Sequence, residues 1–349
     1  MNSSGGRKRK LALVVGLIVS AIFLFLALRR IDIHGLWQTL LTSRWWPWYV
    51  LAPAVYVLGL LARGVRCREI LRPHCDLPVA TSTNIVVIGY AANNVLPARI
   101  GEVVRAYVLS RKANLTVSLS LAVTLLERIF DGLTITFLLL LAALWSPLPE
   151  WGREVLYAAG GIFAVAVAGV IFVMVAKEAV LALTKRVTSF LPPRISARIL
   201  SIVDRAIAAT DCLRDPWLAF KVGALSFVVW AIEGTMYTLI LPAFGLPANP
   251  VWGFMAMTVT NLGILIPSSP GYVGPFHYFC SQALGIFGVA NETALGYAIM
   301  AHLLSYLPVT LWGLAALAYY GIQLGAASGP GDPPAEAGDQ AQPMLKTGT

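Results

Sequence analysis

Long apolar runs dominate the chain, and its polar residues gather between them. Six runs approach or exceed the roughly 20 residues of helix that cross a bilayer. They are Leu11–Leu28, Trp48–Leu61, Leu115–Leu144, Val155–Ala176, Val222–Leu241 and Thr293–Tyr320. The pattern predicts an all-α polytopic membrane protein with about six spanning helices.

Two further apolar stretches are interrupted. Pro78–Lys112 breaks at Asn93–Gly101, and Val251–Ala290 breaks at Pro267–Gly271. Val251–Ile266 would give a helix of about 24 Å at ~1.5 Å per residue, which is shorter than a hydrocarbon core of ~30 Å. Each interrupted stretch therefore predicts a re-entrant helical hairpin, and two short tilted spans are the alternative.

The two breaks share a sequence pattern. LPARIGE and IPSSPGY both contain Pro-x-x-x-Gly, with asparagine a few residues upstream. Proline ends a helix, glycine permits a turn, and asparagine or serine can bond freed backbone groups. The residues expected to shape the hairpins are Pro97, Gly101, Pro267, Pro270, Gly271 and Gly274. Similar stretches entering from opposite faces predict an inverted repeat over roughly 48–145 and 222–320, as in many transporters. Two kinks with a packing role are the alternative.

Composition and charge sharpen this picture. The 349 residues are 58% hydrophobic and 12% charged, against about 45–50% and 25% in soluble domains. Lys and Arg concentrate at residues 7–10, 62–112 and 177–221, so the positive-inside rule predicts an inner-membrane protein with both termini cytoplasmic. Arg63 and Arg66 are thereby expected in a cytoplasmic loop. The net charge of +9 fits this bias and anionic lipid, without nucleic acid.

The chain divides into a basic N-terminus (1–10), a transmembrane domain (11–322) and a tail (323–349) whose composition predicts disorder. Within residues 177–221, isoleucines at 195, 199 and 202 share a helical face away from the arginines, which predicts a helix on the cytoplasmic membrane surface. The cysteines and histidines lack metal-ligand spacing, and no phosphate-binding loop motif occurs. No metal or cofactor is expected.

Charged residues fall inside one predicted span. Glu127 and Asp131 are four residues apart and share a helical face, with Arg128 about 100° away. A charge at the bilayer centre costs at least about 2.5–3.5 kcal/mol, so these side chains should point into the bundle. Arg99 and Arg105 are the expected partners, whether the network is structural, functional or both. The candidate substrate-binding residues are Asn93, Asn94, Arg99, Glu102, Arg105, Glu127, Arg128, Asp131, Asn261, Ser268, Ser269 and His302.

Three motifs together resemble a known family. NNVLPARIGEVVRAYVLSRK, VTLLERIFDGL and PSSPGYVGPF followed by GYAIMAHLLSYLPVTLWG are similar to the flippase-like transmembrane family that includes the membrane half of lysylphosphatidylglycerol synthase. The resemblance covers roughly residues 10–322. The family's marked positions fall on Asn94, Pro97, Arg99, Gly101, Glu102, Arg105, Glu127, Arg128, Asp131, Pro267, Ser269, Pro270, Gly271 and Gly274.

The resemblance implies a lipid flippase that moves a phospholipid or glycolipid through a polar cavity between the hairpins. The soluble aminoacyl-transfer domain of the synthase relatives has no counterpart here, so we expect no enzyme activity. A membrane-embedded transferase and an accessory subunit of a lipid or lipid-linked glycan pathway are the alternatives. The expected partner is a lipid with an anionic or glycosylated headgroup, together with a second copy of the chain or a pathway enzyme.

Overall fold

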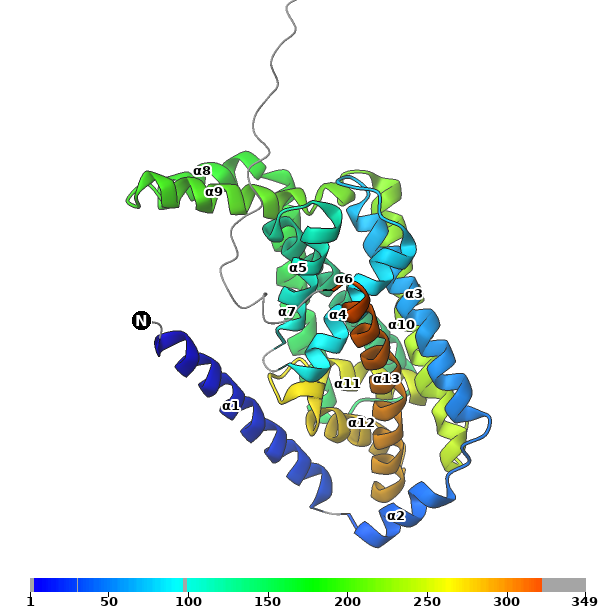
Figure 1. The fold of residues 1–349 in the computed structure, drawn as a ribbon. Helices are drawn as coiled ribbons and strands as arrows, with labels where there is room; N and C mark the ends of the chain where they lie inside the picture. Colours follow the sequence, from blue (N-terminus) through cyan, green and yellow to red (C-terminus); the bar gives the residue numbers. More distant parts are fainter. Residues whose placement is uncertain (1–2, 30, 97–98, 322–349) are drawn as a thin grey trace, which may run out of the picture.

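The computed structural model describes residues 3–29, 31–96 and 99–321, and every regular element in these ranges is helical (Figure 1). Within these ranges, five helices are long and apolar enough to cross a membrane, or six if the bent pair α1 (Ser3–Leu28) and α2 (Ile33–Thr42) forms one span. The prediction of an all-α polytopic membrane protein is confirmed.

The long helices mostly follow the predicted spans. They are α3 (Trp48–Leu71), α6 (Val117–Trp145), α7 (Glu150–Val175), α10 (Pro216–Ile240) and α13 (Asn291–Tyr319). The expectation that Arg63 and Arg66 lie in a cytoplasmic loop is wrong. Helix α3 continues past Leu61 and buries both arginines, because carboxylates on other helices pair with them.

The two interrupted stretches form pairs of short helices. The first gives α4 (Val79–Val95) and α5 (Gly101–Ala113), which pack on each other. The second gives α11 (Pro250–Gly263), the 3-10 turn η3 (Pro270–Tyr272) and α12 (Pro275–Gly285), with α11 against α12. Pro97 lies outside the described residues. The re-entrant placement of these pairs in a bilayer stays a prediction.

The long-short-short-long order occurs twice, as α3–α6 and as α10–α13. The first helices of the two halves are antiparallel, since Lys221 near the start of α10 lies 3.0 Å from Glu69 near the end of α3. At their other ends, the Arg44 amide donates to the Ala243 carbonyl at 2.8 Å. Helix α4 packs on α13, and its counterpart α11 packs on α6 (Figure 1). The two halves thus interlock through equivalent contacts and run in opposite directions.

The apolar core is divided in the same way. One buried cluster comes mainly from α3–α6, and a second comes mainly from α10–α13 with Ile135, Leu139 and Ala142 of α6. Polar and charged side chains therefore concentrate between two apolar cores, which places the candidate site at the junction of the halves.

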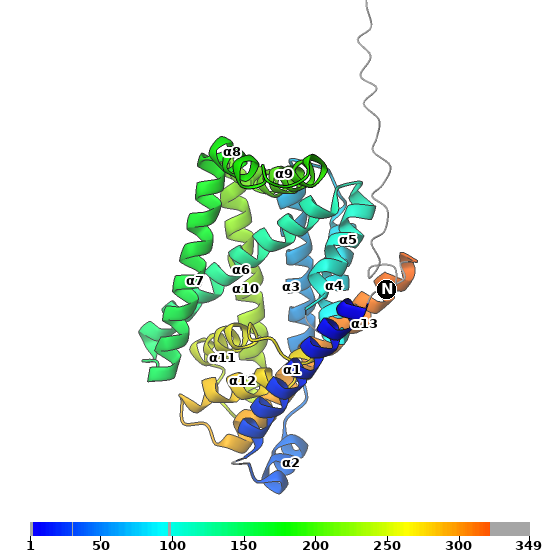
Figure 2. The same ribbon diagram turned by 90° about the vertical axis from the view of Figure 1, so that its left-hand side faces the viewer.

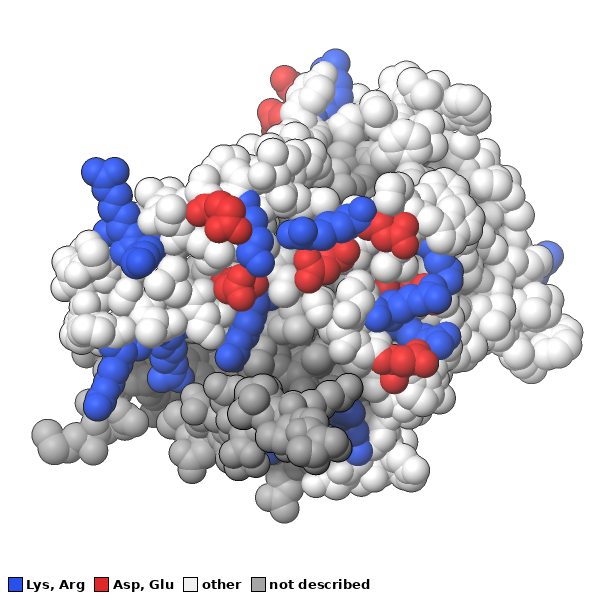
Figure 3. Space-filling view, turned by 90° about the horizontal axis from the view of Figure 1, so that it is seen from above, with Lys and Arg blue, Asp and Glu red and all other residues white. Residues whose placement is uncertain are grey.

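Helices α8 (Lys177–Val187) and α9 (Pro193–Ala208) form an arm that projects from one end of the bundle (Figure 1). Viewed from that end, Lys and Arg are interspersed with Asp and Glu (Figure 3). Ile195 and Ile202 of α9 are exposed and match the predicted apolar face. Its location on a membrane surface stays a prediction.

Candidate functional site

The two interrupted stretches meet inside the molecule. The Arg99 guanidinium donates a hydrogen bond to the Ile264 carbonyl and lies 5.4 Å from the centroid of the Tyr272 ring. The Tyr306 hydroxyl donates to the Asn94 carbonyl at 3.3 Å. Arg99 and Tyr272 have φ of 53° and 59°, a left-handed conformation uncommon outside glycine. Contacts between the two breaks therefore hold both loops in strained conformations.

Asn93 closes the first break. Its side-chain oxygen accepts a hydrogen bond from the Gly101 amide at 2.7 Å, and its amide nitrogen donates to the Glu102 carboxylate at 3.0 Å. A Cβ atom at Gly101 would lie 2.1 Å from the Gly89 carbonyl oxygen. Glycine is therefore required where α5 begins against α4.

The second break is fastened to α1. Gly271 and Gly274 have φ of 70° and 97°, which glycine adopts without strain. The Ser269 amide donates to the Ser20 hydroxyl at 2.8 Å, and a Cβ at Gly274 would lie 2.4 Å from the Ser20 carbonyl oxygen. The structure thus places Ser269 against α1, and neither Ser269 nor Ser268 lines the central cavity described below.

Glu127 of α6 lies behind this cavity in a fully buried ion pair. Arg105 of α5 donates to both of its carboxylate oxygens, at 2.6 and 2.7 Å. Arg66 approaches the same carboxylate at 3.9 Å from α3. Paired and buried in this way, Glu127 joins three helices and does not line the cavity.

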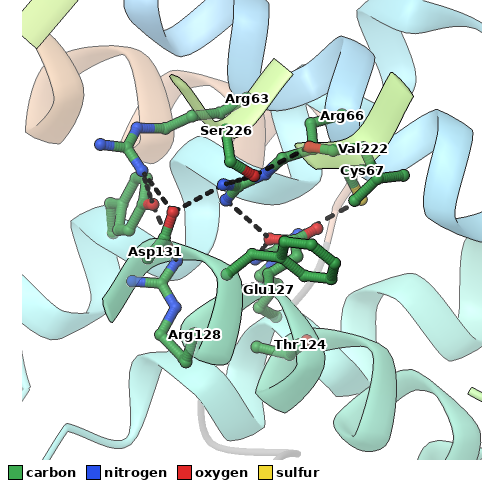
Figure 4. Close-up of polar contacts among 12 residues, drawn as sticks. Arg63, Arg66, Cys67, Thr124, Glu127, Arg128, Asp131, Val222 and Ser226 are labelled. Carbon is green, nitrogen blue, oxygen red and sulfur yellow. Dashed lines mark hydrogen bonds and ion pairs between the residues drawn. The ribbon is translucent and has the colours of Figure 1, made fainter. Parts of the chain in front are cut away.

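Asp131 lies one turn further along α6, next to Arg63, Arg66 and Arg128 (Figure 4). It borders the cavity. It accepts hydrogen bonds from Arg66 at 2.6 Å and from the Trp230 indole at 2.9 Å. Arg128 lies 3.3 Å from its other oxygen, with a third of the Arg128 side chain exposed. The expected pairing of Arg99 with a span carboxylate is wrong, because its guanidinium bonds the Ile264 carbonyl instead.

A third ion pair joins the two halves directly. Arg63 of α3 donates to Glu233 of α10 at 2.6 Å, and Asn261 of α11 donates to the other oxygen of Glu233 at 3.2 Å. The Arg63 guanidinium carbon also lies 4.5 Å from the centroid of the Trp230 ring. Its other terminal nitrogen donates to the Tyr90 hydroxyl at 3.0 Å, so Arg63 is fixed in place by protein groups.

These groups surround a cavity of about 480 Å³ between the halves. Its polar and charged lining comprises Arg63, Tyr90, Asn93, Asn94, Arg99, Glu102, Arg128, Asp131, Glu233, Asn261, His302 and Ser305, and its aromatic lining includes Tyr56, Trp230, Tyr272 and Phe276. The structure brings most of the predicted site residues together here. Arg105, Glu127, Ser268 and Ser269 lie outside the lining.

Sequence reasoning missed Arg63, Trp230 and Glu233 as lining residues. One signal was available for the first. Arg63 and Arg66 are three residues apart, so on a helix that continues beyond Leu61 they share a face as Glu127 and Asp131 do. Two matched charged faces on different helices indicate pairing rather than a loop.

Among the side chains that the structure describes, no three His, Cys, Asp or Glu residues lie together as metal ligands.

Glu102 differs from the other cavity carboxylates. It forms no ion pair within 4 Å with any described residue, and it accepts one hydrogen bond from Asn93. It is therefore the cavity carboxylate that no described cation pairs with.

The fold and site define a helical multi-pass membrane protein whose oppositely directed halves enclose a charged cavity. Residues 13–313 match the family model described as the lysylphosphatidylglycerol synthase TM region. The chain belongs to this family, as the sequence motifs predicted.

Three curated relatives are similar over much of the chain. Glycosyltransferase AglD of Haloferax volcanii is 26% identical over 90% of this chain and 55% of its own length, so this chain spans about half of it. A UPF0104 membrane protein of Methanocaldococcus jannaschii is 25% identical over 65% of this chain and 92% of its own. A UPF0104 membrane protein of Methanothermobacter thermautotrophicus is 24% identical over 68% of this chain and 74% of its own length. No solved structure matches.

The similarity to AglD corrects one prediction. The sequence was expected to encode a protein without enzyme activity, yet a relative covering nine-tenths of the chain is named a glycosyltransferase. The expectation rested on the lack of a counterpart to the soluble synthase domain, which does not exclude chemistry in the membrane part.

Proposed function

We propose that the cavity binds the headgroup of a membrane lipid that carries phosphate or sugar, and that the protein acts on this lipid in a lipid or lipid-linked glycan pathway. One observation carries the proposal. The Nε atoms of Arg99 and Arg128 are buried without hydrogen-bond partners in the described part of the chain, and both residues line the cavity. Buried donors without partners are costly unless a ligand satisfies them.

The charge balance favours an anion. Around the junction lie five arginines, Arg63, Arg66, Arg99, Arg105 and Arg128, and four carboxylates, Glu102, Glu127, Asp131 and Glu233. Arginine donates two parallel hydrogen bonds to phosphate. Aromatic rings and asparagine amides beside these arginines suit the ring faces and hydroxyls of a sugar.

The first candidate action is transfer of a sugar from a lipid phosphate to an acceptor hydroxyl, which the name of the AglD relative supports. The acceptor oxygen would bond the anomeric carbon as the bond from that carbon to the phosphate oxygen breaks, and Glu102 would take the hydroxyl proton, because its carboxylate lines the cavity without an ion pair to a described residue. The lipid phosphate would be the leaving group, with its negative charge held by Arg99 and Arg128. We expect Glu102→Gln to abolish transfer while headgroup binding persists.

The second candidate action is translocation, which the opposed directions of the two halves favour. A site between inverted halves can be exposed alternately to the two faces of the membrane. The meeting of Arg99 with Ile264 would then be a contact that changes as the halves move.

One reconstitution separates the two actions. The full chain is placed in liposomes with phosphatidylglycerol or a polyprenyl-phosphate hexose, and both headgroup accessibility and sugar transfer are followed. Arg128→Ala should reduce either activity at least tenfold through loss of a charged hydrogen bond. Val103→Ala, next to Glu102 but exposed, is the matched control. Unchanged binding and activity in Arg128→Ala would refute the site.

A further inference from the structure

One side of the cavity is apolar and open to the outside of the bundle. Leu125 of α6 and Leu265, which follows α11, both line the cavity, yet their side chains are 52% and 46% exposed. In a membrane-spanning bundle, such exposed apolar side chains face lipid hydrocarbon. The cavity therefore reaches the bilayer at this side.

A single stripe of α6 connects this opening to the charged interior. Leu125, Arg128, Gly132 and Ile135 all line the cavity, and their spacing of three, four and three residues puts them on one helical face. Leu125 and Arg128 are about 4.5 Å apart along the axis at ~1.5 Å per residue. An exposed leucine and a cavity arginine are thus neighbours on one surface.

Phe163 of α7 completes the opening. Of the residues of α7, all of which the structure describes, Phe163 alone lines the cavity. Its ring occupies the space above Gly132, where a Cβ atom would lie 1.8 Å from the ring. Figure 2 shows α7 beside α6 at the edge of the bundle, and only Gly152 and Ala159 of α7 are buried.

We propose that Leu125, Phe163 and Leu265 form a hydrocarbon-chain subsite, where the chain of the bound lipid leaves the cavity for the bilayer. This inference rests on the proposed function, which places the headgroup beside Arg128. Leu125 lies less than one helical turn from Arg128 along α6. When the headgroup is bound at Arg128, the first methylenes of the lipid chain therefore reach Leu125. Burial of each methylene against apolar side chains adds to affinity, so an amphiphile fits the lining better than a free anion does.

Photo-crosslinking tests the subsite in the intact protein. The full chain in nanodiscs is mixed with phosphatidylglycerol bearing a diazirine on one acyl chain, and labelled peptides are mapped by mass spectrometry. We expect several-fold more label on the peptides of Leu125, Phe163 and Leu265 than on that of Phe172, which is 56% exposed on α7, more than Phe163, but does not line the cavity. Excess unlabelled phosphatidylglycerol should remove this difference. Equal labelling of both sets would overturn the subsite.

A binding measurement separates this inference from the proposed function. Phe163→Ala should weaken the binding of phosphatidylglycerol about tenfold, Phe172→Ala should not, and the binding of glycerol phosphate, which has no chain, should be unchanged in both. Loss of glycerol phosphate binding in Arg128→Ala supports the headgroup site alone. If glycerol phosphate fails to bind the native chain while the crosslinks persist, the headgroup proposal fails and the chain subsite stands. Equal lipid affinity in both phenylalanine variants overturns the subsite.

Discussion

At the scale of single residues, Arg66 organises the charged interior. Its side chain is fully buried, and it donates to Asp131 at 2.6 Å and to Ser226 at 3.1 Å while lying 3.9 Å from Glu127. It therefore separates two carboxylates that would otherwise repel each other on one face of α6. Removing any member of this set would leave a buried charge without compensation.

Glu127→Gln tests this balance. The substitution keeps the shape but leaves Arg105 without its bidentate partner, and breaking a buried pair typically costs about 3–5 kcal/mol. We expect a clearly lowered Tm in detergent. Glu178→Gln, the same change at an exposed position, should leave Tm unchanged. The exchange Glu127→Arg with Arg105→Glu should recover part of the loss, and a Glu127→Gln variant as stable as the native chain would contradict the pairing.

At the scale of elements, the breaks between short helices depend on glycine at close approaches. A Cβ at Gly101 would meet the Gly89 carbonyl oxygen at 2.1 Å and the Asn93 side-chain oxygen at 2.4 Å. Gly285 at the end of α12 has no atom within 4 Å of such a Cβ. Replacing Gly101 by alanine therefore creates a steric clash, whereas the same replacement at Gly285 does not and serves as the control.

Gly101→Ala should destabilise the protein by at least about 2 kcal/mol, because backbone atoms cannot make room. Gly285→Ala should change stability by less than about 1 kcal/mol. Thermal unfolding followed by circular dichroism measures both. If the two variants unfold at the same temperature, α4 and α5 are not packed at Gly101 as described.

Both helix breaks could be predicted from the sequence, because proline, glycine and asparagine interrupt a helix through their own backbone conformation and their hydrogen bonds to neighbouring residues. Hydropathy placed Arg63 in a loop although its spacing from Arg66 indicated a shared helical face, and its partner Glu233 could not be identified because it is 170 residues away. Sequence reasoning assigned Arg99 to a carboxylate for a related reason: charge alone favours an ion pair, but the loop geometry brings Arg99 to the Ile264 carbonyl. Pairings between distant helices need the packing of the halves, which no local pattern encodes.

Helix α9 offers a test of the predicted membrane-surface arm. Ile202 is exposed on its apolar face, and Ala197, five residues earlier and therefore about 140° around the helix, is exposed on the far side. A spin label at Ile202→Cys in liposomes should be more accessible to oxygen, which concentrates in lipid, and one at Ala197→Cys to a water-soluble nickel chelate. Equal accessibility of both labels to the chelate would place the arm in water.

At the scale of the whole molecule, the opposed halves put the two short-helix pairs at opposite ends of the bundle (Figures 1 and 2). Helices α4 and α5 adjoin the end that carries the α8–α9 arm, and α11 and α12 adjoin the end where α2 lies. Their breaks meet between these ends through Arg99. The cavity thus belongs to neither half alone, so its function depends on which end faces the cytoplasm.

Cysteine labelling decides the orientation. The positive-inside rule predicts that Lys185 faces the cytoplasm and that Arg153 and Ala290 face outward, and all three are exposed. Burial raises the pKa of the native Cys75 thiol, and that of Cys212 to about 12, so both stay protonated near neutral pH and react slowly with maleimide.

An exposed introduced cysteine has an ordinary pKa of about 8.5 and should therefore label first near neutral pH, with native background rising as pH increases. We expect Arg153→Cys and Ala290→Cys to react with an impermeant maleimide on intact cells, and Lys185→Cys to react after permeabilisation. Replacing Cys75 by serine provides the background control. Labelling of Lys185→Cys on intact cells would reverse the orientation. It would also turn the α8–α9 arm and the α4–α5 pair to the outer face, so that a cytoplasmic donor would reach the cavity from the α11–α12 side.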